Sequence, residues 1–144
     1  MARHGIIDAN VVLRYLLNDD PKQSPEAVEL FEQAPDGSLY LSVIILAEVT
    51  WTLKSHFAVP RELICTSIQR VIALPCVSVD PIAFDAVSRY AKSNVDFVDC
   101  ALAAAGLATG LPLVTYDRDY RKFPDVTAKR PSEMLATFTE PDEK

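Results

Sequence analysis

The stretch HGIIDANVVLRYLL, residues 4–17, contains the pattern from which the fold can be inferred. Its first residues form a short apolar run that ends at Asp8, which is typical of a buried strand. Val11 to Leu17 then favour a helix, which is expected to stop in the breaker cluster Asn18-Asp19-Asp20-Pro21. A strand that passes through an acidic residue into a helix is the first half of an α/β unit.

The same alternation of strands and helices continues along the rest of the chain. Further strands are expected at residues 38–41, 76–79 and 111–115. Helices are expected to begin near Ser24, Ser42, Arg61, Asp80, Asp96 and Pro131, with Asp80 and Asp96 as helix caps. This order predicts the α/β class, as a three-layer α/β/α sandwich with a mainly parallel sheet. We expect a single domain over residues 1–144, with a core at about 4–128 and a C-terminal helix and tail at 131–144.

Composition narrows the class of protein. The 144 residues are about half apolar, but no run is long enough to span a membrane and the start does not resemble a signal peptide, so a cytoplasmic protein is expected. The three cysteines lie among apolar neighbours without Cys-x-x-Cys spacing, which favours inert core thiols. The net charge of −6 argues against binding to nucleic acid through bulk charge alone.

Two acids follow expected strands. Asp8 ends the first strand and Asp117 comes after the last, and ligands of open parallel sheets bind beyond such carboxyl ends. Asp8 has an alternative role as a helix N-cap, although Asn10 is equally suited to it. Asp117, with Asp119, has the alternative role of an ordinary acidic turn, and the residues that follow lack the features of an EF-hand.

Other acids lie on expected helices. Glu48 interrupts a strongly apolar helix and has no basic residue three or four positions away, so burying it without a cation would be costly. Its alternative place is a narrow exposed stripe with Thr52 and Ser55. Asp96 and Asp99 share one face at a helix start, where a capping pair is the alternative reading. Together these acids suggest an all-oxygen site for magnesium or manganese.

Four segments are similar to a known family: Ile6–Leu13, Ser42–Glu48, Asp96–Leu102 and Leu113–Tyr120. In this order and spacing they resemble the PIN domains, and within that family the toxin ribonucleases of VapBC toxin–antitoxin systems. The resemblance spans residues 6–120, nearly the whole expected domain. Where this chain has Ala9, the family usually has a threonine or serine, so one hydroxyl near the expected site is missing.

The resemblance implies a metal-dependent endoribonuclease that uses Mg²⁺, or Mn²⁺ in its place. Its catalytic and metal-binding acids correspond to Asp8, Glu48, Asp99 and Asp117. Asp96 would be an accessory acid, and Asn10 and Thr115 would orient the first and fourth acids. The resemblance also implies an RNA substrate, a cognate antitoxin that fills the groove near the acids, and a homodimer.

Cations that could meet RNA phosphates are Arg14, Arg118, Arg121 and Lys122, with Lys129 and Arg130 nearby and Tyr116 or Tyr120 available for base stacking. The alternative is a solvated surface charge run. Two other functions compete with the ribonuclease. One is a PIN-like scaffold that only binds protein. The other is a magnesium phosphatase of the haloacid dehalogenase type, which would require Asp-x-Asp where this chain has Asn10 as the third residue.

Overall fold

The structure, a computed structural model, describes residues 2–139 and confirms the α/β class with parallel strands. Its elements are β1 (Gly5–Ile6), α1 (Ala9–Leu17), α2 (Gln23–Gln33), β2 (Leu39–Leu41), α3 (Val43–Ser55), α4 (Arg61–Ile72), β3 (Val77–Val79), α5 (Ala83–Lys92), α6 (Phe97–Thr109), β4 (Leu113–Val114), η1 (Arg118–Lys122), β5 (Ala128–Lys129) and α7 (Pro131–Thr137). Residues 140–144 of the expected C-terminal tail lie outside the described range. In that range no helix is both long and apolar enough to cross a membrane.

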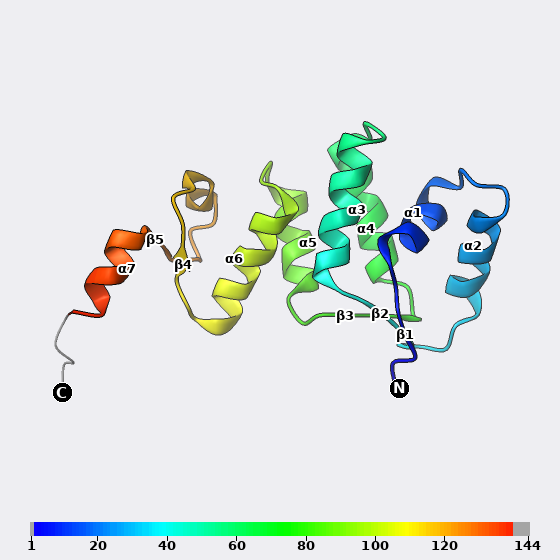
Figure 1. Ribbon diagram of the computed structural model, residues 1–144, viewed down its shortest axis with the longest axis horizontal. Helices are drawn as coiled ribbons and strands as arrows, with labels where there is room; N and C mark the ends of the chain where they lie inside the picture. Colours follow the sequence, from blue (N-terminus) through cyan, green and yellow to red (C-terminus); the bar gives the residue numbers. More distant parts are fainter. Residues whose placement is uncertain (1, 140–144) are drawn as a thin grey trace.

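The strands divide between two parallel sheets. β1, β2 and β3 form the first in that order, with Leu39 paired to Gly5 on one side and Val77 on the other. β4 and β5 form the second, with Leu113 opposite Ala128. Figure 1 shows α5 and α6 between the two sheets, so that β4 lies well apart from β1 along the long axis of the molecule.

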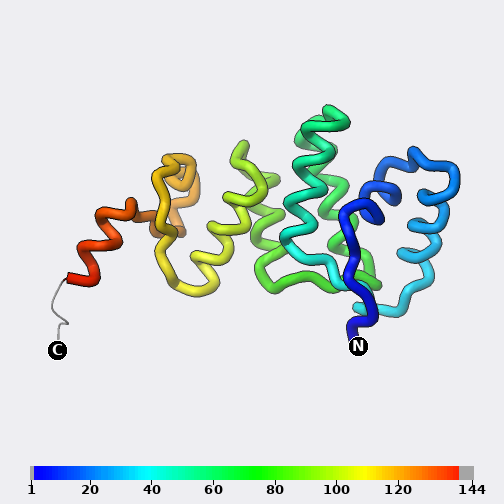
Figure 2. The backbone as a smooth tube through the Cα atoms, in the orientation of Figure 1, coloured from blue at the N-terminus to red at the C-terminus, as the bar shows by residue number. Residues whose placement is uncertain are grey.

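The first sheet and its helices form most of the hydrophobic core. Val12, Leu41, Leu46, Val49 and Ile64 have no exposed surface, and they come from four different elements. In the tube of Figure 2, α1 and α2 lie side by side at the N-terminal end, with α3 and α4 next to them. The apolar faces of these helices pack on one another and on the first sheet, and together they close the core.

The end of the chain is attached to α5 and α6. Gly106 of α6 makes this possible: a Cβ there would lie 3.3 Å from the Leu111 carbonyl oxygen and from the side chains of Leu113 and Val126. Arg89 of α5 is buried and pairs with Asp125 at 2.6 Å. These contacts hold residues 113–137, here called the C-terminal unit, on the far side of α6.

The expectation that Asp80 caps the following helix is wrong. α5 begins at Ala83, and the Asp80 carboxylate instead accepts hydrogen bonds from the Tyr40 hydroxyl and, at 2.9 Å, from the Val43 backbone N–H. That N–H belongs to the first turn of α3, where a helix leaves donors without internal partners. Asp80 therefore stabilises the start of α3, and the Ser42 side chain caps the same helix by accepting from Ile45 N.

Candidate functional site

Asp99 and Tyr120 form a side-chain hydrogen bond that joins two distant segments near the expected acids. Asp99 lies in the first turn of α6, and the Tyr120 hydroxyl of η1, a residue that is only 4% exposed, donates to its Oδ1 at 3.0 Å. Partial burial raises the pKa of Asp99, the Tyr120 hydrogen bond opposes this rise, and the charges of Asp117, Asp96 and Asp119 add to it. Mutually repelling carboxylates of this kind are stabilised when a cation binds between them.

Asp117 is held by its own backbone just beyond β4. Its Oδ1 accepts from Asp119 N at 2.8 Å, which caps η1, and its N–H donates to Thr115 Oγ1 at 2.9 Å. Thr115 thus orients the main chain at Asp117 rather than its carboxylate. The Asp117 side chain is exposed and close enough to Asp99 to raise that residue's pKa.

Asp96 occupies the N-cap position of α6, as expected, but its side chain makes no capping hydrogen bond. Instead it lies 3.6 Å from Lys54 of α3 in an exposed ion pair. Such pairs contribute about 0–1 kcal/mol. Asp96 therefore remains available to a ligand beside Asp99.

Asp8 lies apart from these acids, just after β1 of the first sheet. It is the N-cap of α1, where its Oδ1 accepts from Ala9 N at 2.8 Å, and both Asp8 and Asn10 are exposed. Arg14, expected to meet phosphate, instead forms two hydrogen bonds to Asp19 at 2.8 and 2.9 Å. Its guanidinium is therefore largely occupied within the chain.

Glu48 is exposed on α3, between two large apolar side chains that are also exposed. Ile44 is 75% exposed and Trp51 is 62% exposed. Because Glu48 is exposed, its carboxylate does not need a cation to offset burial. It leaves an acid on an apolar surface, which is an unusual combination for a surface that faces only water.

These positions bring together only part of the expected acid set. Asp99 interacts electrostatically with Asp117 and Asp96, whereas Asp8 caps a helix at the other sheet. Within residues 2–139, no three His, Cys, Asp or Glu side chains gather closely enough to hold one ion. The carboxylate oxygens suit a hard divalent cation in their chemistry. Within the described residues of a single chain, too few of these carboxylates meet at one place to hold such an ion.

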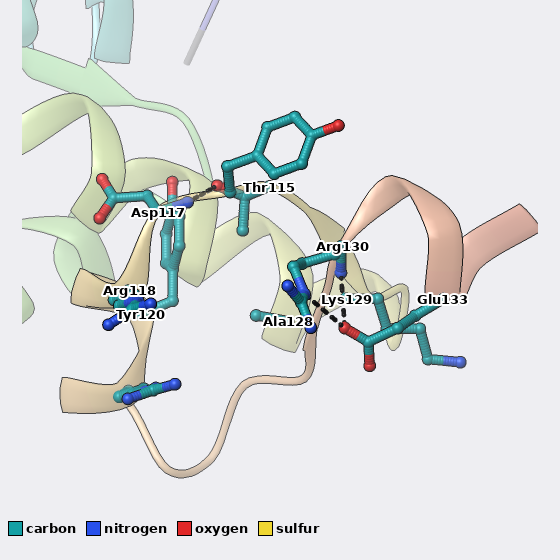
Figure 3. Close-up of a pocket in the computed structure, with 10 residues that line it drawn as sticks. Thr115, Asp117, Arg118, Tyr120, Ala128, Lys129, Arg130 and Glu133 are labelled. Carbon is teal, nitrogen blue, oxygen red and sulfur yellow. Dashed lines mark hydrogen bonds and ion pairs between the residues drawn. The ribbon is translucent and has the colours of Figure 1, made fainter.

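A cationic cavity of about 480 Å³ opens beside Asp117 (Figure 3). Its charged lining comprises Asp117, Arg118, Arg121, Lys129, Arg130 and Glu133, from η1, β5, α7 and the residues beside them. Glu133 binds the Arg130 side chain at 3.5 Å, so it neutralises only one of the four cations. Lys122, also expected to meet RNA, points elsewhere and bonds to Asn94.

A second cavity of about 270 Å³ lies between α3 and the start of α6. Ala47, Trp51, Phe97 and Val98 supply its apolar lining, and Asp99 lies at its side. Trp51 and Val98 are both more than half exposed. An apolar groove therefore borders Asp99.

Tyr120 is the site residue whose role the sequence does not predict, because the sequence indicates only a ring that is available for base stacking. Its partner lies 21 positions earlier in the chain, and no local pattern connects the two. Its position three residues before Phe123, another buried aromatic residue, signals burial but does not identify the partner.

Comparison with known proteins gives the family. A sequence model of the PIN domain matches residues 6–126, which is most of the chain, and the protein therefore belongs to the PIN domain family. The match includes all four expected acids. No curated protein matches the chain.

Two solved structures are similar to the chain at low sequence identity. One is the crystal structure of VapBC2 from Rickettsia felis bound to a DNA fragment from their promoter, with 12% identity, a TM-score of 0.37, and coverage of 90% of this chain and 98% of that one. The other is a toxin–antitoxin complex from Klebsiella pneumoniae, with 19% identity, a TM-score of 0.32, and coverage of 87% and 96%. The family assignment rests on the sequence model.

Proposed function

We propose that this PIN domain protein is a divalent-metal-dependent endoribonuclease and the toxin of a toxin–antitoxin pair. The observation that carries the proposal is that Asp117 lines a cationic cavity and that Asp99 is hydrogen-bonded to Tyr120, another residue of the same lining. Acids attract a metal ion and cations attract the phosphate backbone, and a phosphodiesterase needs both at one place.

RNA is the substrate we propose, bound along the cationic cavity. Arg118 and Arg121 are exposed, and Lys129 and Arg130 line the same cavity. Tyr116 is 78% exposed at its edge, where a ring can stack on an unpaired base. This arrangement favours single-stranded RNA, since a base inside a duplex cannot reach an aromatic ring.

Mg²⁺ or Mn²⁺ is the cofactor we propose, with Asp8, Glu48, Asp99 and Asp117 as its ligands. Asp96 and Asn10 would supply further polar groups, and Thr115 would orient the fourth acid. An oxygen-only donor set favours these ions over zinc. Asp99 and Asp117 are the two ligands whose proximity supports this assignment.

A cognate antitoxin is the partner we propose for the groove between α3 and α6. Its apolar lining, together with exposed Ile44, Trp51 and Val98, fits the apolar face of a short amphipathic segment. A segment seated there would lie over Asp99 and obstruct it. A homodimer in the cytoplasm completes the proposal.

The decisive experiment measures both metal binding and RNA cleavage. Calorimetric titration with Mn²⁺ and cleavage of labelled single-stranded RNA in Mg²⁺ are compared for the wild type and Asp99→Asn. We expect EDTA and the Asp99→Asn change each to abolish cleavage, and the change also to weaken Mn²⁺ binding at least about tenfold.

The matched control is Asp36→Asn, which removes an exposed acid in the turn before β2 and should leave both quantities unchanged. Cleavage that persists in EDTA would refute the metal-dependent mechanism. A wild type that binds Mn²⁺ but cleaves no RNA would support the protein-binding scaffold instead.

A further inference from the structure

β1 has an open edge. Gly5 N and Ile7 N both donate to β2 or its flanking residues, at 3.2 and 2.9 Å. Because alternate residues of a parallel strand bond to opposite sides, the N–H and C=O of Ile6 point away from β2. Within residues 2–139 no strand pairs with that side, and the Ile6 side chain is 80% exposed.

β4 has the matching edge. Leu113 N and Thr115 N donate to Thr127 O and Lys129 O of the β5 segment, at 2.8 and 2.9 Å. The backbone groups of Val114 therefore point away from β5, and its side chain is 52% exposed. Over the described part of the chain no strand pairs on this side either. Open, apolar strand edges of this kind are templates for pairing.

The two edges stay apart within one chain. β4 is attached to α6 through the close approach at Gly106, and α6 packs extensively on α5. The Arg89–Asp125 and Tyr120–Asp99 contacts attach the rest of the C-terminal unit to the same two helices. Figure 1 shows these helices, with α3, between β1 and β4.

We propose that two copies of this chain join reciprocally, with β1 of each copy pairing in parallel with β4 of the other. Each half of the dimer then has a five-stranded parallel sheet in the order β3, β2, β1, β4 and β5, the last two from the second copy. Because the same exchange occurs twice about a two-fold axis, the assembly closes as a dimer.

Charge favours this pairing between unlike ends. Residues 1–60, which include β1, contain eight acids and four cations, whereas residues 113–137 contain four acids and five cations. Residues 1–60 of one copy therefore attract the C-terminal unit of the other. The same residues of two copies would repel each other, which disfavours a dimer in which β1 pairs with β1.

The pairing also completes the acid set, and this part rests on the proposed function. Asp8 follows Ile6 by two residues and Asp117 follows Val114 by three. If Ile6 lies opposite Val114 in neighbouring parallel strands, both carboxylates come to the same edge of the joined sheet, with strands about 4.8 Å apart. Each site would then combine Asp8 of one copy with Asp99 and Asp117 of the other.

Cross-linking tests the pairing without any assay of activity. Ile6→Cys in one tagged copy and Val114→Cys in a differently tagged copy are co-expressed and treated with a short bismaleimide. The wild type is the blank, because its three cysteines are at most 8% exposed. We expect a covalent heterodimer. A second sample carries both changes in one chain. A link within that chain without any covalent heterodimer in the first sample would overturn the proposal. The absence of a link in both samples would overturn it as well.

A backbone variant tests the edge itself. Val114→Pro removes an N–H that has no partner in one copy, so the second sheet should be preserved while the dimer is lost. Sedimentation velocity should show a dimer for the wild type and a monomer for Val114→Pro. Leu63→Ser, which removes a similarly exposed apolar side chain on α4, should remain a dimer. A monomeric or open-ended polymeric wild type would overturn the proposal.

Paired inactive variants test the shared site. A heterodimer of Asp8→Asn and Asp117→Asn, isolated through its two tags, has one intact site of two and should show about half the wild-type cleavage rate. A heterodimer of Asp99→Asn and Asp117→Asn is the control, because both acids belong to the same side of the site; it should remain inactive.

The two proposals fail in different ways. A cross-linked dimer whose wild type cleaves no RNA would remove the ribonuclease and leave the pairing. If the wild type cleaves RNA but the heterodimers are inactive and links form only within single chains, the pairing is refuted and the ribonuclease proposal stands.

Discussion

The hydroxyl of Tyr120 donates to Oδ1 of Asp99 across 3.0 Å, and this bond joins η1 to the first turn of α6. The bond fixes the orientation of the carboxyl group through Oδ1, and Tyr120 makes no hydrogen bond to Oδ2. A buried tyrosine thereby fixes the position of the most buried of the expected acids.

Tyr120→Phe should raise the pKa of Asp99 further, because it removes the hydrogen bond that opposes the effect of burial. Since the deprotonated carboxylate binds a cation, we expect the onset of Mn²⁺ binding to shift to higher pH and the affinity at pH 7 to fall about tenfold. Carbon NMR titration of Asp99 and calorimetry at several pH values measure the two effects. Tyr116→Phe, at an exposed ring beside the same site, should change neither.

Arg121→Ala and Lys129→Ala should weaken RNA binding in EDTA and flatten its dependence on salt. For single-stranded RNA, removing one cation that binds a phosphate reduces the slope of log K against log salt by about 0.7. Fluorescence anisotropy between low and moderate salt gives the slopes. Arg70→Ala, an exposed cation on α4, should keep the wild-type slope; a reduction as large as that at the cavity would mean that only overall charge matters.

Asp125→Asn should destabilise the fold at neutral pH by about 1 kcal/mol, because it removes one carboxylate from Arg89, and the half-exposed position of Asp125 limits the effect. Arg89 lowers the pKa of Asp125 in the folded state. The stabilisation is therefore present above the ordinary aspartate pKa and is lost as the pH falls through the lowered value. Urea unfolding should separate the two proteins at pH 7 and bring them together at low pH; a constant difference would contradict the ion-pair explanation.

Gly106→Val should loosen the C-terminal unit from α6. A Cβ at this position already lies 3.3 Å from three atoms, one of them a backbone oxygen that cannot rotate away, and valine adds two methyl groups. Overpacking of this kind costs about 1–3 kcal/mol, which urea unfolding can measure. Ala108→Val, on the exposed side of the same helix, controls for the helix propensity of valine; equal losses would exclude crowding as the cause.

Much of the secondary structure could be predicted from the sequence because its causes are local. The apolar run ending at Asp8 forms β1, and the Ser42 hydroxyl caps α3 as its position predicts. Asp80 shows where local reasoning fails. Its side chain satisfies donors about 40 positions away instead of its own helix, and only the paired sheet brings β2 and the start of α3 to it.

The sequence predicts which residue types make up the site, but it does not predict how they are arranged in space. Arg14 was expected to meet phosphate, but Asp19 lies five residues further on and binds it. The sequence does not predict the short elements η1 and β5, because elements of five and two residues are too short for a periodic pattern. They nevertheless form the cationic cavity and place Tyr120 against Asp99.

The sequence by itself determined the α/β class, the order of the acids and their positions after strands and at helix starts. These properties follow from hydrophobic period and from caps, which act over a few residues. The tertiary structure decided which acids meet, and it divided the strands between two sheets with open edges at Ile6 and Val114. That outcome depends on contacts between distant segments, such as Gly106 with Val126 and Arg89 with Asp125, whose packing energies no local pattern contains.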